Sequence, residues 1–143
     1  MRLFADAVIS RQFLLFVEAL SGIDCLIADP YFIGGGAMVT ARDQYLKVHA
    51  DFNWHHKLQM HRRLNFLLYL TPNWQSDWGG ALEMWPKDME RASSKRIVPR
   101  FNRAVIFQAT DDSNLGQPDP LRTPQGIYRR VFSSFYYTTR KTD

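Results

Sequence analysis

The feature that most limits the possible folds of this chain is a series of short apolar or alternating segments, which follow one another from about residue 45 onward. In chain order the segments read YLKVHAD, RRLNFLLYL, GGALEMW, RAVIFQ and YRRVFSSFYYTT. Alternation and short apolar runs bounded by glycine, proline, asparagine and aspartate are typical of β-strands. Several such strands in one chain predict a β-sandwich or a β-barrel.

The segment ahead of these strands has a helical period instead. Its apolar residues recur at the spacing of one helix face, so residues 9–21 predict an amphipathic helix, with Ser10 as its cap and Gly22 at its end. Between the last two strands, residues 111–124 hold three prolines and predict a long loop. A chain of 143 residues without a linker has the size of one domain. We therefore expect a single, mainly β domain over residues 1–143, with a short N-terminal region and one helix packed outside.

Cysteine usage and hydropathy indicate where in the cell the chain is expected. Cys25 is the only cysteine, so neither an intrachain disulfide nor a thiolate zinc site can form. A lone cysteine fits a reducing cytoplasm, and we expect a cytoplasmic location. Asp6, Arg11 and Glu18 interrupt the N-terminal apolar residues, which therefore do not resemble a signal peptide. No apolar stretch approaches the roughly 20 residues of a membrane span, so we expect no membrane partner.

The basic residues raise the question of nucleic-acid binding. The chain has 18 basic and 14 acidic residues and a net charge of +4. Basic residues occur in pairs at Arg62-Arg63, Lys95-Arg96, Arg129-Arg130 and Arg140-Lys141. Such pairs are compatible with a nucleic-acid patch. However, no basic block is long enough to require one, and a solvated basic surface is the simpler interpretation.

All four histidines fall between residues 47 and 70. Residues i and i+2 of a strand point to the same face, so His49 and Asp51 are expected to project together. An imidazole beside a carboxylate can chelate a divalent metal and makes up two-thirds of the facial triad of non-haem Fe(II) oxygenases. By itself this pattern is weak, and a buried ion pair or a surface histidine remains open. His55, His56 and His61 lack the spacing of three or four that a metal-binding pair on a helix would need, and the paired His55 and His56 are expected on a solvent-facing loop.

The order of the motifs along the chain is more specific than any one of them. GGG is followed by HADFNWH, RRLNFLLYLTPNW, WGGALEMW, PRFNRAVIFQATDDS and GQPDPL…GIYRR…YYTT. Together they resemble the Fe(II)- and 2-oxoglutarate-dependent dioxygenase superfamily, in particular its bacterial prolyl-4-hydroxylase-like branch, from about Leu20 to Thr139. The resemblance implies a double-stranded β-helix of the jelly-roll or cupin-like type. It also implies an enzyme that uses Fe(II), 2-oxoglutarate and O₂ to hydroxylate a peptidyl, prolyl or small-molecule substrate.

The resemblance also implies roles for individual residues. His49 and Asp51 match the first two iron ligands. Tyr69 matches a tyrosine that hydrogen-bonds the far carboxylate of 2-oxoglutarate, and Arg129 matches the basic residue that pairs with that carboxylate. A guanidinium binds a carboxylate bidentately, and we expect Arg129 to point inward and Arg130 outward. Aromatic residues from several segments are expected in the core or at the substrate mouth: Phe52, Trp54, Trp74 and Trp85.

The sequence departs from the family pattern at the third iron ligand. The family places a histidine there, in a motif of the form Ser-x-His-Gly-x-Pro. Ser113, Gly116 and Pro118 keep that register, and Leu115 stands at the ligand position. Leucine cannot coordinate a metal, so the iron triad is incomplete in this chain.

A second departure concerns the 2-oxoglutarate site. Val131 stands where the family often has a serine two residues after the arginine. Asp111 and Asp112 lie just before Leu115 and are candidates for a substitute metal ligand. Two interpretations therefore remain: an oxygenase of weak or altered activity, and an inactive β-helix domain that binds a ligand or a protein.

Overall fold

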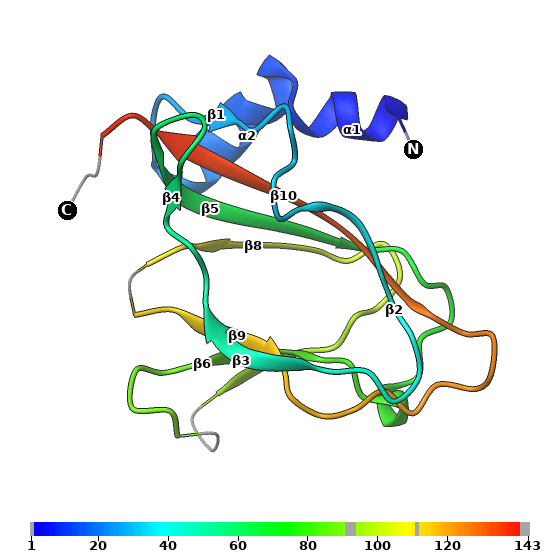
Figure 1. Ribbon diagram of the computed structural model, residues 1–143. Helices are drawn as coiled ribbons and strands as arrows, with labels where there is room; N and C mark the ends of the chain where they lie inside the picture. Colours follow the sequence, from blue (N-terminus) through cyan, green and yellow to red (C-terminus); the bar gives the residue numbers. More distant parts are fainter. Residues whose placement is uncertain (1, 91–93, 111, 141–143) are drawn as a thin grey trace.

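The computed structural model describes residues 2–90, 94–110 and 112–140, and shows two β-sheets with helices against one of them (Figure 1). The helices are α1 (Arg2–Val8), α2 (Arg11–Ser21) and a 3₁₀ turn, η1 (Ser76–Trp78). The strands are β1 (Ile27–Ala28), β2 (Gly36–Thr40), β3 (Leu46–Ala50), β4 (Trp54–His55), β5 (Met60–Tyr69), β6 (Leu82–Trp85), β7 (Lys95–Ile97), β8 (Ala104–Gln108), β9 (Asn114–Gln117) and β10 (Arg129–Thr138). The predicted mainly β class is confirmed.

The N-terminal region contains two helices where the sequence predicts one. The predicted helix is α2, whose first turn is capped by the Ser10 hydroxyl, which accepts a hydrogen bond from the Phe13 amide over 3.3 Å. Gly22 ends the helix in the left-handed conformation, with φ of 71°. The short α1 was not predicted. Among the residues described, no helix has the length and apolar character to cross a membrane.

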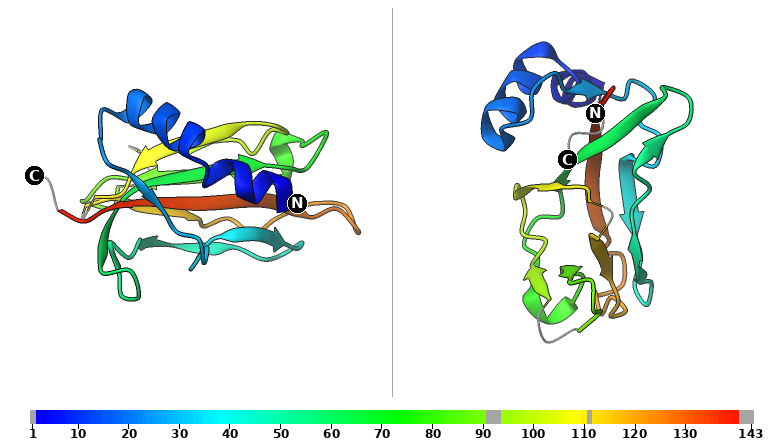
Figure 2. Two further views of the ribbon diagram at one scale, coloured as in Figure 1. Left: turned by 90° about the horizontal axis from the view of Figure 1, so that it is seen from above. Right: turned by 90° about the vertical axis from the view of Figure 1, so that its left-hand side faces the viewer.

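The strands form two antiparallel sheets. The larger sheet has the order β1-β10-β5-β4, with β2 also pairing with β10 and β8 with β5. The smaller sheet has the order β3-β9-β6-β7. Both helices lie against β10 and β5, on the side of the larger sheet that faces away from the smaller one (Figures 1 and 2). This is the layered arrangement expected of a double-stranded β-helix.

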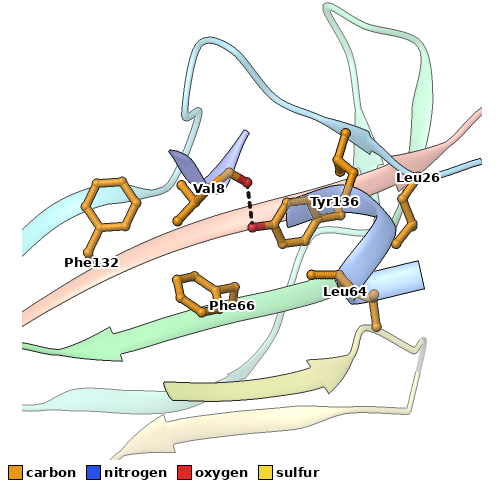
Figure 3. Close-up of a cluster of buried hydrophobic side chains, with 8 residues drawn as sticks. Val8, Leu26, Leu64, Phe66, Phe132 and Tyr136 are labelled. Carbon is orange, nitrogen blue, oxygen red and sulfur yellow. Dashed lines mark hydrogen bonds between the residues drawn. The ribbon is translucent and has the colours of Figure 1, made fainter. Parts of the chain in front are cut away.

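The outer face of the larger sheet forms the main apolar core with the helices (Figure 3). Its buried members are Val8, Leu14, Val17, Leu26, Leu64, Phe66, Phe132 and Tyr136. The Tyr136 hydroxyl donates a hydrogen bond over 3.1 Å to the Val8 carbonyl at the end of α1 (Figure 3). Because side chains alternate along a strand, the remaining residues of β5 and β10 face the smaller sheet. Among these inward residues are several polar ones, which form the candidate site.

The structure corrects the prediction of an irregular loop over residues 111–124. Within it, β9 pairs with β3 on one side and β6 on the other. A Cβ atom at Gly116 would lie 2.8 Å from the Val48 Cα and 2.9 Å from the Leu46 carbonyl oxygen. Only glycine therefore permits β9 to come this close to β3. Proline and glycine in this segment predict a loop from local sequence, whereas the strand forms through pairing with distant residues.

We predict that Gly116→Ala lowers the free energy of unfolding by about 1–3 kcal/mol, because the added methyl group overlaps the β3 backbone. Urea denaturation monitored by circular dichroism measures the change. Asn114→Ala in the same strand adds no atoms and should change stability by about 0.5 kcal/mol or less. Equal stability of Gly116→Ala and the unmodified protein would show that the two strands separate without cost.

Candidate functional site

His49 and Asp51 lie together at the end of β3. The His49 Nε2 atom is 3.7 Å from the Asp51 Oδ1 atom. The other ring nitrogen, Nδ1, donates a hydrogen bond over 2.8 Å to the Lys47 carbonyl. In neutral His49 this leaves the Nε2 lone pair available beside the carboxylate, which is the arrangement that metal-binding histidines use. The His49 side chain is 41% exposed and that of Asp51 is 16% exposed, so solvent reaches the pair from the side of the histidine.

The second carboxylate oxygen of Asp51 is held by two side chains of β5. Asp51 Oδ2 accepts hydrogen bonds from Arg62 Nη2 over 3.1 Å and from Asn65 Nδ2 over 2.9 Å. Arg62 Nε also donates to Asn65 Oδ1 over 2.6 Å. These contacts occupy one carboxylate oxygen and leave Oδ1 facing His49. The protein therefore binds one carboxylate oxygen of Asp51, and the other oxygen is available to a metal.

Aromatic rings enclose the Arg62 guanidinium. Its central carbon lies 3.5 Å from the centre of the Phe135 ring and 4.7 Å from that of Phe52. Burial lowers the pKa of Arg62, and the nearby Asp51 carboxylate opposes that shift. An arginine remains charged under such conditions, so the Asp51–Arg62 pair is an ion pair in a largely apolar setting.

A bulge in β5 turns Arg62 toward this site. Tyr136 pairs with Leu64, whereas the next residue, Tyr137, pairs with Arg62. Arg63 is therefore an extra residue in β5, and the alternation of the strand shifts by one. Sequence reasoning treated Arg62 as a surface cation and missed this role. The sequence feature that could have indicated this role is a charged residue near the start of an otherwise apolar strand.

Leu115 lies directly opposite His49. The two residues are partners in the β3–β9 pair, and Met84 of β6 is the partner of Leu115 on its other side. Cross-strand partners point to the same face, so the buried Leu115 side chain flanks the histidine. This position agrees with the match to the family motif, in which Leu115 stands where the third metal ligand is expected.

Asp112, one of the two proposed substitutes for the missing ligand, does not complete the site. Asp112 forms an exposed ion pair with Lys87, over 2.7 Å, and this contact raises the pKa of Lys87. Asp111 lies outside the described residues. Within the part of the chain that the structure describes, no three histidine, cysteine or acidic side chains are arranged to hold a metal. The available donors are thus one imidazole and one carboxylate, which suit Fe(II) but fill only part of its coordination.

Arg129 points inward at the start of β10. It is only 8% exposed, and its Nε donates a hydrogen bond over 3.0 Å to the Gly80 carbonyl. Burial lowers the pKa of the guanidinium, which forms no ion pair with any described residue. The neighbouring Arg130 is exposed. A buried guanidinium without a carboxylate partner among the described residues is suited to bind an anion.

Tyr69 lies beside this guanidinium. The central carbon of Arg129 is 5.2 Å from the centre of the Tyr69 ring. Burial raises the pKa of Tyr69 and Arg129 opposes the shift, yet no hydrogen bond of normal geometry reaches the buried hydroxyl among the described residues. Val131, the β10 partner of Tyr69, faces the same interior. Four more buried hydroxyls, of Thr123, Ser133, Ser134 and Tyr137, also make no hydrogen bond in the described part of the chain, and those of Ser133 and Tyr137 lie on the inward face of β10 with Val131. Such unsatisfied groups fit a site for a polar ligand.

A cavity of about 710 Å³ borders Arg129. Residues 38–40 and 43–46, on the segment that runs from β2 into β3, form one wall, and Leu82 of β6 lies on another. We call this space the Arg129 cavity. Its volume is within the usual range for small-molecule sites.

The remaining histidines have structural contacts. His55, expected on a solvent-facing loop, is instead 2% exposed and lies 3.2 Å from the equally buried Asp29 carboxylate. His56 is exposed, as expected, and His61 packs edge-to-face on Trp54. Asp29 also accepts hydrogen bonds from the backbone amides of Tyr31 and Ile33, so it fixes the turn after β1. These groups belong to the scaffold.

Comparisons with known proteins agree with this geometry. Residues 36–138 match a family described as the 2OG-Fe(II) oxygenase superfamily. A stretch of 52 residues is 35% identical to mouse prolyl 3-hydroxylase OGFOD1, covering 34% of this chain and 10% of that protein. The corresponding protein of Xenopus laevis is 36% identical over 52 residues, with the same coverage of 34% and 10%. The chain thus spans about a tenth of these curated relatives.

Solved structures show the same fold. A Phytophthora capsici prolyl 4-hydroxylase aligns with 92% of this chain and 41% of its own, at a TM-score of 0.62 and 17% identity. A Pseudomonas putida prolyl-4-hydroxylase aligns with 92% of this chain and 63% of its own, at a TM-score of 0.57 and 17% identity. A Trichoplax adhaerens prolyl hydroxylase, in complex with a hypoxia inducible factor peptide fragment, covers 71% of this chain and 42% of its own, at a TM-score of 0.53 and 24% identity.

We predict that Arg62→Met lowers the free energy of unfolding by about 3–5 kcal/mol, because it leaves the Asp51 carboxylate largely buried without its cation. Chemical denaturation of the protein without added metal measures the loss. Arg130→Met, at an exposed arginine, is the matched control and should change stability by about 0.5 kcal/mol or less. If the two variants lose the same stability, the Asp51–Arg62 pair does not support the fold.

Proposed function

This chain belongs to the 2OG-Fe(II) oxygenase superfamily, and we propose that it is a 2-oxoglutarate- and Fe(II)-dependent dioxygenase with an incomplete iron triad. In this proposal His49 and Asp51 hold the iron, and Arg129 with Tyr69 holds the far carboxylate of 2-oxoglutarate. The observation that carries it is the inward-facing, unpaired Arg129 on the same fold that presents His49 beside Asp51. The family match does not favour the inactive binding domain that the sequence left open.

Bound Fe(II) and 2-oxoglutarate would supply the oxidising chemistry, and the protein's own residues provide binding and orientation. Arg129, which is itself buried, would compensate the charge of the co-substrate. Tyr69 lies beside Arg129, burial raises the pKa of its hydroxyl, and as a neutral phenol it can donate a hydrogen bond to a carboxylate. Arg62 and Asn65 hold Asp51 in one orientation. Fixed groups of this kind stabilise charge without reorganising during the reaction.

We propose a peptidyl or prolyl substrate, with a small molecule as the alternative. Support comes from the 52-residue similarity to a prolyl 3-hydroxylase and from the fold shared with a prolyl hydroxylase that binds a peptide. The single domain over residues 1–143 and the cytoplasmic location stay predictions from the sequence.

We predict that Leu115→His tightens Fe(II) binding by about 10-fold or more and raises the uncoupled conversion of 2-oxoglutarate to succinate. The loss of even an outer partner of a metal ligand costs about 10–100-fold in metal affinity or activity, and a direct ligand should matter at least as much. Fe(II) titration and succinate release measure the two effects. Val131→Ser should add to the effect by placing a hydroxyl near Arg129. An unmodified protein that already matches Leu115→His in Fe(II) affinity would indicate that another residue completes the site.

We further predict that Arg129→Ala weakens 2-oxoglutarate binding by about 2–5 kcal/mol, since it removes one partner of a desolvated charge pair. Arg130→Ala is the matched control, because Arg130 is adjacent in sequence but exposed. Isothermal titration calorimetry gives both affinities. Equal weakening by the two substitutions would contradict the inward anchor.

A further inference from the structure

We propose that the Arg129 cavity accepts carboxylic acids with an apolar body larger than the two methylene groups of 2-oxoglutarate. The inference rests on the proposed role of Arg129 as the carboxylate anchor. It goes beyond that role by naming the chemical class that the rest of the cavity selects.

The cavity offers one site for negative charge. Arg129 is its buried cation, and its Nε is already bound to the Gly80 carbonyl, which leaves the terminal nitrogens for a ligand. Asp43 also lines the cavity, but its side chain is 80% exposed and lies 3.7 Å from Arg42. A carboxylate is therefore expected at Arg129 and nowhere else in this space.

The other walls are mostly apolar. Met38 of β2 and Val131 of β10 are cross-strand partners, and both line the cavity together with Leu82. Gln117 is a polar residue of the lining, but its amide nitrogen already donates to the Gln44 and Asp119 carbonyls. Thr40 and Gln44 are two other uncharged polar residues with hydrogen-bonding side chains on the wall from β2 to β3, and most of the remaining lining is apolar.

The mouth of the cavity is also lined by apolar side chains. Leu46 is 50% exposed, Tyr45 is 51% exposed and Met38 is 39% exposed, and all three line the opening formed between β2 and β3. Apolar side chains at a cavity mouth gain free energy when a ligand covers them. A longer apolar body would therefore be stabilised along its whole length.

The cavity is also larger than 2-oxoglutarate requires. At about 30 Å³ for each non-hydrogen atom, the share of liquid volume that a water molecule takes, the ten such atoms of 2-oxoglutarate fill about 300 Å³. The Arg129 cavity measures about 710 Å³. More than half of it is therefore left for a bulkier apolar group.

The test compares butanoate, hexanoate, glutarate and 2-oxoglutarate by isothermal titration calorimetry on the full chain without added metal. Each methylene group buried should tighten binding about fourfold, so hexanoate should bind about fifteenfold more tightly than butanoate, at the same charge. Arg129→Gln should abolish binding of all four acids, and Arg130→Gln should not.

The substitutions Met38→Gln and Leu46→Gln, made together, should reduce the preference for hexanoate over butanoate and should weaken hexanoate binding more than glutarate binding. Leu15→Gln, at an exposed leucine of α2, is the matched control. Hexanoate binding no tighter than butanoate, while 2-oxoglutarate still binds through Arg129, would overturn this inference and leave the proposed function standing. Hexanoate binding that survives Arg129→Gln would also overturn it. No binding of any acid at Arg129 would overturn the proposed anchor as well.

Discussion

The ion pair between Asp51 and Arg62 links the two halves of this fold. Asp51 follows β3 of the smaller sheet, and Arg62 belongs to β5 of the larger sheet. The pair therefore joins the sheets at the place where the candidate metal ligands lie. Asn65 and the rings of Phe52 and Phe135 hold the guanidinium in position. The orientation of Asp51, and with it the geometry of the site, depends on this contact.

The Asp51–Arg62 pair also explains how the fold tolerates the missing iron ligand. In a complete triad the metal would compensate the Asp51 charge, whereas here Arg62 and Asn65 already compensate it through Oδ2. A buried carboxylate without a partner would destabilise the fold. Because a partner is present, the chain can place an apolar side chain at Leu115 without leaving the Asp51 carboxylate unpaired. Loss of the third ligand thus weakens the metal site but leaves in place the Asp51–Arg62 ion pair, which joins the two sheets.

Sequence reasoning recovered the features that depend on local pattern. Strand alternation predicted the β class and placed His49 and Asp51 on one face, and the family resemblance pointed to Arg129 rather than Arg130 as the inward arginine. The inward role of Arg62 was missed, because it depends on a bulge that appears only when β5 pairs with β10. The strand β9 was missed for a similar reason: its segment contains turn-forming residues, and its pairing partners are distant in sequence. The position of Arg62 and the strand β9 were thus missed because both depend on pairing with residues distant in sequence.

Anaerobic titration of the protein with Fe(II) and 2-oxoglutarate, followed by optical spectroscopy, tests the central claim most directly. The account predicts a charge-transfer band when both are present, which saturates only at high Fe(II) because Leu115 supplies no ligand. The band should disappear in His49→Ala. Absence of the band in the unmodified protein at every Fe(II) concentration would contradict the claim that His49 and Asp51 form an iron site beside the Arg129 anchor.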